Sequence, residues 1–236
     1  MAVESKSFPA SAAPPIPAVT IRVQRVGVWE TYRRHLTWAQ VVIAFLSVEC
    51  AVWAARLSVR SRWAVAAGVV VVVFALVDRP SLHRLGSGLP SALGASVILA
   101  LAFSGAVAMV LAARLAGGHV PANPSFPHWN LVWQYLIWAL VQQFMLQSFF
   151  FTRFEELFGS STAVWVGGTV FAAVHLPNMI LTTCTLVSGL FFCEMFRRYR
   201  SIYPLGIAHA VLGLTLSATI PEGLLQHMRV GIGFLR

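Results

Sequence analysis

The stretch LPSALGASVILALAFSGAVAMVLAARL, residues 89–115, decides the fold, because it runs for 27 residues with one charged side chain, that of Arg114. A helix rises about 1.5 Å per residue, so this stretch is long enough to cross a hydrocarbon core of about 30 Å. Similar apolar stretches recur on both sides of it. The sequence therefore predicts an all-α protein, a polytopic transmembrane helical bundle of about seven spans. The seven expected spans are Trp38–Arg56, Trp63–Val77, Leu89–Leu115, Trp129–Phe151, Ala163–Leu176, Met179–Phe196 and Ile202–Ile220.

Composition supports a membrane environment for the whole chain. Hydrophobic residues make up 58% of the sequence and charged residues 11%, with a mean hydropathy of +0.74, whereas soluble domains carry roughly 25% charged residues. The net charge of +9 comes from 17 basic and 8 acidic residues. Basic residues beside apolar spans serve orientation and contacts with anionic headgroups. We expect the lipid bilayer, and no nucleic acid, as the partner of these charges.

Four regions follow from the distribution of prolines, arginines and apolar residues. Residues 1–20 hold four prolines and several small residues, which predicts a disordered amino-terminal tail. Residues 21–37 carry four arginines among valines and a tryptophan, which predicts a basic segment lying on the headgroups. Residues 38–220 are expected to form the transmembrane bundle, and residues 221–236 a carboxy-terminal interfacial segment.

The basic residues also predict an orientation. The amino-terminal segment and the second, fourth and sixth loops together hold 11 of the 17 basic residues. Since loops rich in lysine and arginine stay in the cytoplasm, the amino terminus is predicted to be cytoplasmic.

The three cysteines, Cys50, Cys184 and Cys193, lie in or beside apolar spans and lack the paired spacing of metal ligands. They are interpreted as packing residues that form neither disulfides nor a zinc site. We therefore expect no metal and no other cofactor.

Five polar side chains interrupt the later apolar stretches: Gln142, Gln143, Gln147, His175 and His209. A polar group without a partner in hydrocarbon costs several kcal/mol, so these side chains are expected to meet. The two glutamines four residues apart, Gln143 and Gln147, lie on one face of a helix. A glutamine amide both donates and accepts, so it can pair with a neutral histidine without placing a charge in the bilayer.

Three ordered stretches carry a family resemblance: QQFMLQSFFFTRFEELFG at 142–159, FAAVHLPN at 171–178 and RRYRSIYPLGIAHAVLG at 197–213. They resemble the CPBP family of intramembrane endopeptidases, the CAAX-protease and bacteriocin-processing proteins also called Abi proteins. The resemblance covers residues 129–220, which are predicted to form a CPBP-like core. It implies intramembrane proteolysis and, because the family is common there, a bacterial cytoplasmic membrane.

This sequence departs most from the family at the first of its three motifs, a Glu–Glu pair followed four residues later by Arg. The motif positions fall on Gln142, Gln143 and Gln147, on Phe171 and His175, and on His209 and Gly213, where the family has Asn or a similar polar residue. Asn178 closes the second stretch and is assigned to the same degenerate network. Both histidines are present, whereas the glutamate pair, the arginine and the last polar residue are replaced.

The resemblance implies that a glutamate and a histidine activate water, while the last histidine and asparagine hold the oxyanion. A glutamine amide cannot accept a proton, so general-base catalysis worth roughly 10²–10⁴-fold is expected to be lost at Gln142. Gly213 removes an oxyanion donor as well. Among other carboxylates, Glu194 is expected to pair with nearby arginines, while Glu49, in the middle of the first span, is either a structural hydrogen-bond partner or a displaced base.

Two functions follow, and whether the chain is an enzyme stays open between them. The first is a CPBP-like pseudoenzyme with weak or no peptidase activity that binds a membrane partner as subunit, assembly factor or escort in a protein complex. The second is an active intramembrane endopeptidase of the CAAX-processing type, using a rearranged site of His175, His209 and Glu49 on a membrane-anchored peptide. A transporter or channel is a third reading, but paired broken helices with ion ligands are not evident.

Overall fold

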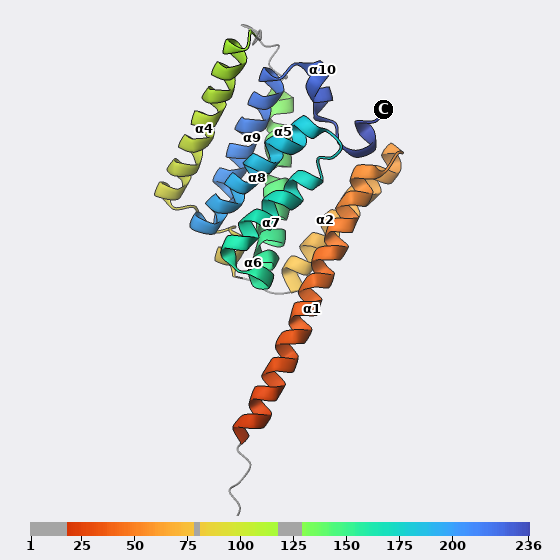
Figure 1. The fold of residues 1–236 in the computed structure, drawn as a ribbon, viewed down its shortest axis with the longest axis vertical. Helices are drawn as coiled ribbons and strands as arrows, with labels where there is room; N and C mark the ends of the chain where they lie inside the picture. Colours follow the sequence, from red (N-terminus) through yellow and green to blue (C-terminus); the bar gives the residue numbers. More distant parts are fainter. Residues whose placement is uncertain (1–17, 78–80, 118–128) are drawn as a thin grey trace, which may run out of the picture. The chain divides into compact units, whose positions relative to one another are not determined.

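The computed structural model of the protein describes residues 18–77, 81–117 and 129–236. The predicted tail, residues 1–20, falls outside these residues except for its last three. The described chain consists of helices and turns without a strand, which confirms the all-α fold (Figure 1). The described chain divides into two compact units between Trp38 and Ala39. The helices that surround the candidate site all belong to the second unit.

The described chain is helical over most of its length. Their bounds are α1 Ala18–Trp53, α2 Leu57–Val77, α3 Leu82–Leu85, α4 Ala92–Leu115, α5 Trp129–Gln143, the π-helix η1 Phe144–Phe151, α6 Thr152–Phe158, α7 Ser160–Ala173, α8 Met179–Tyr199, α9 Ile202–Thr219 and α10 Glu222–Leu225, with 3₁₀ turns η2 Gln226–Met228 and η3 Gly231–Gly233. α1 continues without a break from the predicted interfacial segment into the first span. The placement of that segment on the headgroups stays a prediction.

Five helices are long and apolar enough to cross a membrane: the Gly27–Trp53 part of α1, α2, α4, α8 and α9. The polytopic helical bundle is therefore confirmed, but the count of about seven spans is not. The expected span Trp129–Phe151 is divided between α5 and the π-helix η1. The expected span Ala163–Leu176 corresponds to α7, whose 14 residues reach only about 21 Å as a helix.

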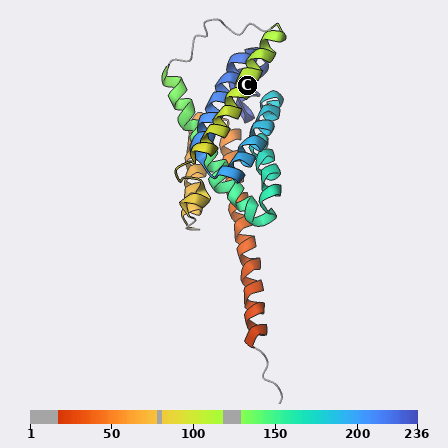
Figure 2. The ribbon, with the colours of Figure 1, turned by 90° about the vertical axis from the view of Figure 1, so that its left-hand side faces the viewer.

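Glycines let the short helix α7 pack closely against α8. A Cβ atom added at Gly189 of α8 would lie 3.1 Å from the Cα atom of Gly168 in α7. Small residues at a helix interface allow this close approach of two backbones. α9 packs against α4 and α5 (Figure 2), which brings the residues of α9 beside those of α5.

Phenylalanines fill the core where η1 passes α8. Phe149 and Phe151 of η1 and Phe192 and Phe196 of α8 are all fully buried. The rings of Phe151 and Phe196 meet edge to face at 5.5 Å, a geometry that aromatic pairs prefer. This packing fixes η1 against α8 and thereby positions Gln143, which precedes the π-helix, and Gln147, which lies within it.

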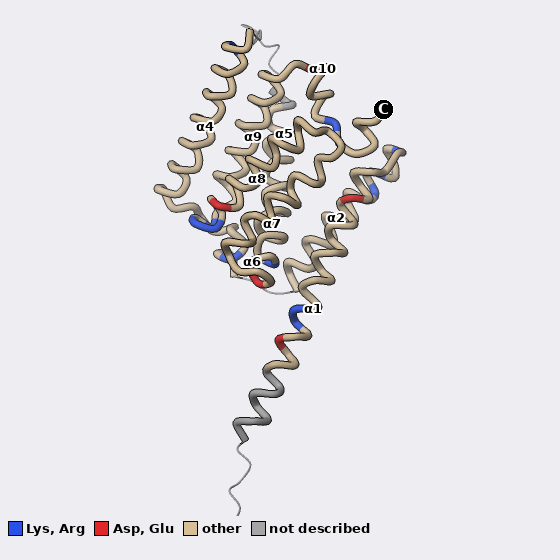
Figure 3. The backbone as a smooth tube through the Cα atoms, viewed as in Figure 1, with Lys and Arg blue, Asp and Glu red and all other residues tan. Residues whose placement is uncertain are grey.

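From α2 onward, the Lys, Arg, Asp and Glu residues gather near the ends of the helices (Figure 3). At one end of the 39–236 unit, Arg84 of α3 pairs with Glu156, and Arg200 pairs with Glu155. Glu194 accepts hydrogen bonds from Arg197 at 2.7 and 2.8 Å and pairs with Arg198. The expectation that Glu194 pairs with nearby arginines is confirmed.

At the opposite end, the carboxy-terminal segment is tied to two helix turns. The Asn178 amide donates to the carbonyl oxygens of Leu225 at 2.9 Å and Arg229 at 3.3 Å. The backbone N–H of Gly231 donates to the carbonyl of Leu176 at 2.8 Å. Arg236 reaches the carbonyl of Ala55, in the α1–α2 turn, at 3.0 Å. Residues 225–236 thus cross from the α7–α8 turn to the α1–α2 turn.

Candidate functional site

Gln143, Gln147 and His209 form a buried polar chain between α5, η1 and α9. The Gln147 amide donates to the Gln143 Oε1 atom at 3.2 Å, and the Gln143 Nε2 atom lies 3.3 Å from the His209 Nδ1 atom. Both glutamines are fully buried, and His209 is 8% exposed. Since the Gln143 nitrogen can only donate, the His209 Nδ1 atom accepts and its Nε2 atom carries the ring proton.

Aromatic rings hold the imidazole of His209 in place. The ring of Phe171 meets it nearly perpendicularly at 5.7 Å, and that of Tyr135 does so at 6.3 Å. The ring of Phe192 lies tilted against it at 5.3 Å. This packing and the bond to Gln143 leave His209 little freedom to change its orientation.

His175 lies beside Phe171, in the turn that follows α7. Its Nδ1 atom is 2.6 Å from the carbonyl oxygen of Phe171, and the two rings are 5.0 Å apart. A neutral imidazole that donates from Nδ1 to a carbonyl leaves its Nε2 atom as an acceptor. Phe171 thus contacts both histidines. His175 presents an acceptor at its Nε2 atom, and His209 presents a donor at its Nε2 atom.

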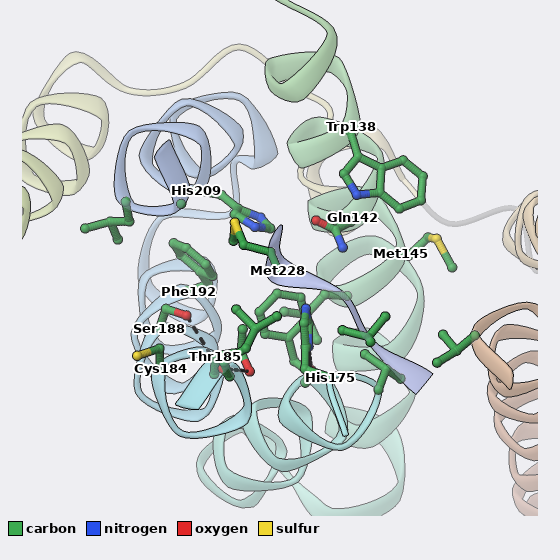
Figure 4. Close-up of a pocket in the computed structure, with 18 of the residues that line it drawn as sticks. Trp138, Gln142, Met145, His175, Cys184, Thr185, Ser188, Phe192, His209 and Met228 are labelled. Carbon is green, nitrogen blue, oxygen red and sulfur yellow. Dashed lines mark hydrogen bonds between the residues drawn. The ribbon is translucent and has the colours of Figure 1, made fainter. Parts of the chain in front are cut away.

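A cavity of about 1300 Å³ adjoins both histidines and is lined in part by Tyr135 and Gln142. Figure 4 shows Gln142 and His209 pointing toward one another from facing helices. Within the described part of the chain, the Gln142 side chain has no hydrogen-bond partner and is partly exposed. No aspartate or glutamate is among the residues that line this cavity in the described ranges. Besides the two imidazoles, the polar side chains that line the cavity near them are the amide of Gln142 and the hydroxyls of Tyr135, Thr185 and Ser188.

Tyr135 is the site residue that sequence reasoning missed. A Cβ atom added at Gly213 would lie 2.0 Å from the Tyr135 hydroxyl oxygen. The hydroxyl therefore occupies the space that a side chain at position 213 would need, and it supplies a polar group there. A signal for it was present in the sequence, because Tyr135 precedes Gln142 by seven residues, which is two helical turns, and so shares its face.

Glu49 is not joined to the histidines by a hydrogen bond among the residues described. Its Oε2 atom accepts from the indole N–H of Trp53 at 2.9 Å, while its Oε1 atom is buried without a partner. It is absent from the residues that line the cavity, although its neighbour Val48 is one of them. Asn178, in contrast, lies at the start of α8, where its side chain accepts from the N–H of Leu181 at 3.1 Å and caps the helix.

Cys193 contacts the glutamine network through its sulfur, 3.8 Å from the Gln147 Nε2 atom. Cys50 and Cys184 are also free thiols. Across residues 18–77, 81–117 and 129–236, no group of three or more His, Cys, Asp or Glu side chains is placed to hold a metal ion.

Comparison with known proteins adds one match. Residues 124–215 match the family model described as type II CAAX prenyl endopeptidase Rce1-like, of the CPBP family. The match confirms the resemblance seen in the three sequence motifs and covers most of the predicted core. No curated protein and no solved structure matches the chain. The match and the spanning helices together support a CPBP-like integral membrane protein.

Proposed function

We propose that this CPBP-like membrane protein has weak or no peptidase activity and acts by binding another membrane component in its cavity. One observation carries the proposal: the cavity wall at the two histidines presents Gln142 and no carboxylate. Hydrolysis of a peptide bond needs a group that takes a proton from water, and an amide cannot do so. A site is assigned by its chemistry rather than by its fold.

The neutral groups are suited to binding. The His209 Nε2 atom donates, the His175 Nε2 atom accepts, and Gln142 and Tyr135 each do both. Groups of this kind recognise an uncharged polar group without placing a net charge inside the bundle. Because Gln143 already uses its amide on Gln147 and His209, the network is fixed before a ligand binds.

Residual endopeptidase activity is the second candidate, and the geometry of His175 favours it. The bond from Nδ1 to the Phe171 carbonyl orients the ring and leaves Nε2 able to accept a proton. A neutral histidine can serve as a general base. Glu49 would contribute to such a site only after a rearrangement, since it neither lines the cavity nor bonds to His175 in the described structure.

The test combines a cleavage assay with identification of the bound component. The full chain is purified in mild detergent, and prenylated and unprenylated membrane-anchored peptides are offered as substrates. We expect no cleavage above the background of a His175→Ala variant. We also expect a protein or lipid to co-purify at a fixed ratio, to be lost from Gln142→Ala, and to be kept by Gln134→Ala, an exposed glutamine on the same helix.

Strong cleavage that His175→Ala abolishes and Gln134→Ala leaves intact would refute the proposal and establish the endopeptidase. Equal recovery of the bound component from Gln142→Ala and Gln134→Ala would instead show that the component does not bind in the cavity at Gln142.

A further inference from the structure

We propose that the membrane component is an anionic amphiphile, with a phosphate headgroup at Arg60, Arg229 and Arg236 and an apolar chain in the cavity. This inference rests on the proposed binding function and names its ligand class. All three arginines line the cavity, and within the described chain no acidic residue does. Of the other groups there, His227 is already paired with Glu222 at 2.8 Å. Among the described residues, the side chains that line this end of the cavity therefore carry a net positive charge.

Arg60 has hydrogen-bonding capacity that the described protein does not use. Its Nε atom is buried and has no partner, and its NH2 group reaches only the carbonyl of Ala54, at 3.5 Å. A buried guanidinium N–H without an acceptor is unfavourable. An anionic oxygen from a ligand would satisfy it, and guanidinium groups match phosphate in a two-bond geometry.

The three arginines lie at the level of one set of helix ends. Arg60 and Arg236 both contact carbonyls of the α1–α2 turn, those of Ala54 and Ala55. Arg229 is held beside the α7–α8 turn through its own carbonyl, which accepts from Asn178 at 3.3 Å. Helix ends of spanning segments lie near the headgroups, where a lipid phosphate is found.

From this end the cavity continues into the bundle along apolar side chains. They include Phe45, Leu101, Met145, Val187, Phe191 and Leu212. The volume of about 1300 Å³ exceeds the roughly 300–1,000 Å³ of pockets for drug-sized ligands, so a long chain fits. Positive charge at the headgroup level with an apolar interior matches an amphiphile that carries its negative charge at one end.

The experiment measures lipid binding to the purified full chain in a neutral detergent. The probes are phosphatidylglycerol, phosphatidylcholine, palmitate and inorganic phosphate, followed by native mass spectrometry and competition with a fluorescent phosphatidylglycerol. We expect saturable binding of phosphatidylglycerol at least tenfold tighter than that of phosphatidylcholine. Inorganic phosphate should not compete, because it lacks the chain. Palmitate tests whether a carboxylate can replace the phosphate, and tighter binding of palmitate than of phosphatidylglycerol would overturn the phosphate assignment.

Matched variants locate the headgroup. Arg60→Gln should weaken phosphatidylglycerol binding at least tenfold, while Arg62→Gln, an exposed arginine of the same helix outside the cavity, should leave it unchanged. Arg236→Gln, at the last residue, supplies a second test if Arg60→Gln does not fold. Equal binding of the two phospholipids, equal effects of the Arg60 and Arg62 variants, or a protein bound in the cavity in place of lipid would each overturn the inference. The cleavage assay is independent of these results, so failure of lipid binding leaves the missing peptidase activity as a separate finding.

Discussion

Tyr135 and Gly213 belong together, although they are far apart in the sequence. The tyrosine hydroxyl occupies the space of a side chain at position 213. The resemblance placed a polar residue at that position, and its replacement by glycine was interpreted only as the loss of a donor. Tyr135 returns a hydroxyl to the same space. This exchange could not be predicted from either residue alone, because it depends on how closely α5 packs against α9.

We predict that Gly213→Asn is strongly destabilising in the otherwise unchanged chain. The new Cβ atom would lie 2.0 Å from the Tyr135 hydroxyl oxygen, and overpacking of this kind costs roughly 1–3 kcal/mol or more. Thermal unfolding in detergent measures the effect. The double variant Tyr135→Ala, Gly213→Asn should recover stability, and a Gly213→Asn variant as stable as the parent would show that the helices move apart freely.

A second prediction concerns the charge of the glutamine network. Gln143→Glu places a carboxyl group at a fully buried position beside His209. An uncompensated buried charge costs about 3–5 kcal/mol, so the melting temperature should fall. Adding Gln147→Arg should return part of the loss, because the side chains at 143 and 147 are already 3.2 Å apart.

The control is Gln134→Glu, which places the same charge on an exposed part of α5 near its start and should lower the melting temperature less than Gln143→Glu does. Additive losses in the double variant would argue against a charge pair between positions 143 and 147.

The contact among Gln143, Gln147 and His209 could be predicted from the sequence. Unpaired amides and imidazoles are unfavourable in hydrocarbon, and the four-residue spacing places the two glutamines on one face of a helix.

Among the elements, α8 begins where the sequence predicted a break, at Pro177–Asn178, and Asn178 caps it. The sequence did not reveal that the same side chain holds the carboxy-terminal segment through Leu225 and Arg229. Two changes at this position separate the two roles. Asn178→Asp keeps an acceptor for the helix cap but loses the amide donor, whereas Asn178→Ala loses both.

We predict that both Asn178 variants speed hydrogen exchange in residues 225–236, because both lose the donated bonds. Only Asn178→Ala should also speed exchange at the start of α8 and lose the roughly 1 kcal/mol of a cap. Hydrogen exchange with mass spectrometry resolves the two segments. Unchanged exchange in residues 225–236 of both variants would mean that Gly231 and Arg236 hold the segment without Asn178.

The predicted span ends at Phe151, but the helix does not end there, and the reason is physical. The helical path continues through α6 to Phe158 and carries the 4% exposed Arg153 with it. Arg153 donates to Gln40 at 2.9 Å and to the carbonyl of Phe74 at 3.0 Å, and its guanidinium lies 3.9 Å from the Phe149 ring centre. Hydropathy ended the span at a charge, whereas these contacts from distant helices allow the charge to be buried.

For the molecule as a whole, the predicted all-α transmembrane bundle is confirmed, and five helices are long and apolar enough to span, while the predicted count of about seven spans is not confirmed. Length and hydropathy identify α2, α4, α8 and α9 because each is a single long helix. They also placed a span at Ala163–Leu176, where the helix α7 has only 14 residues, and they give no sign of the change from α-helix to π-helix at Phe144. The cavity likewise could not be predicted, since it is bounded by helices from across residues 39–236.

The orientation is testable with one residue before the membrane crossing of α2 and one residue after it. Leu57 is 79% exposed and Leu89, after the helix, is 98% exposed. In a chain whose own cysteines are replaced by alanine, we predict that Leu57→Cys reacts with a membrane-impermeant maleimide in intact cells. Leu89→Cys should react only after permeabilisation, because a cytoplasmic amino terminus places it inside.

Labelling of the two cysteines from one side would mean that α2 does not cross the bilayer. Labelling from opposite sides in the reverse order would keep the span and correct only the orientation.

The fit between Tyr135 and Gly213 also constrains the history of this chain. An ancestor with a bulky residue at position 213 had to lose it before a tyrosine could enter at position 135, or to lose it in the same step. Once both changes are in place, neither can be reversed alone without a collision or a void. Mutation one residue at a time would therefore be slow to restore the earlier state, and lineages that carry Tyr135 should retain the glycine.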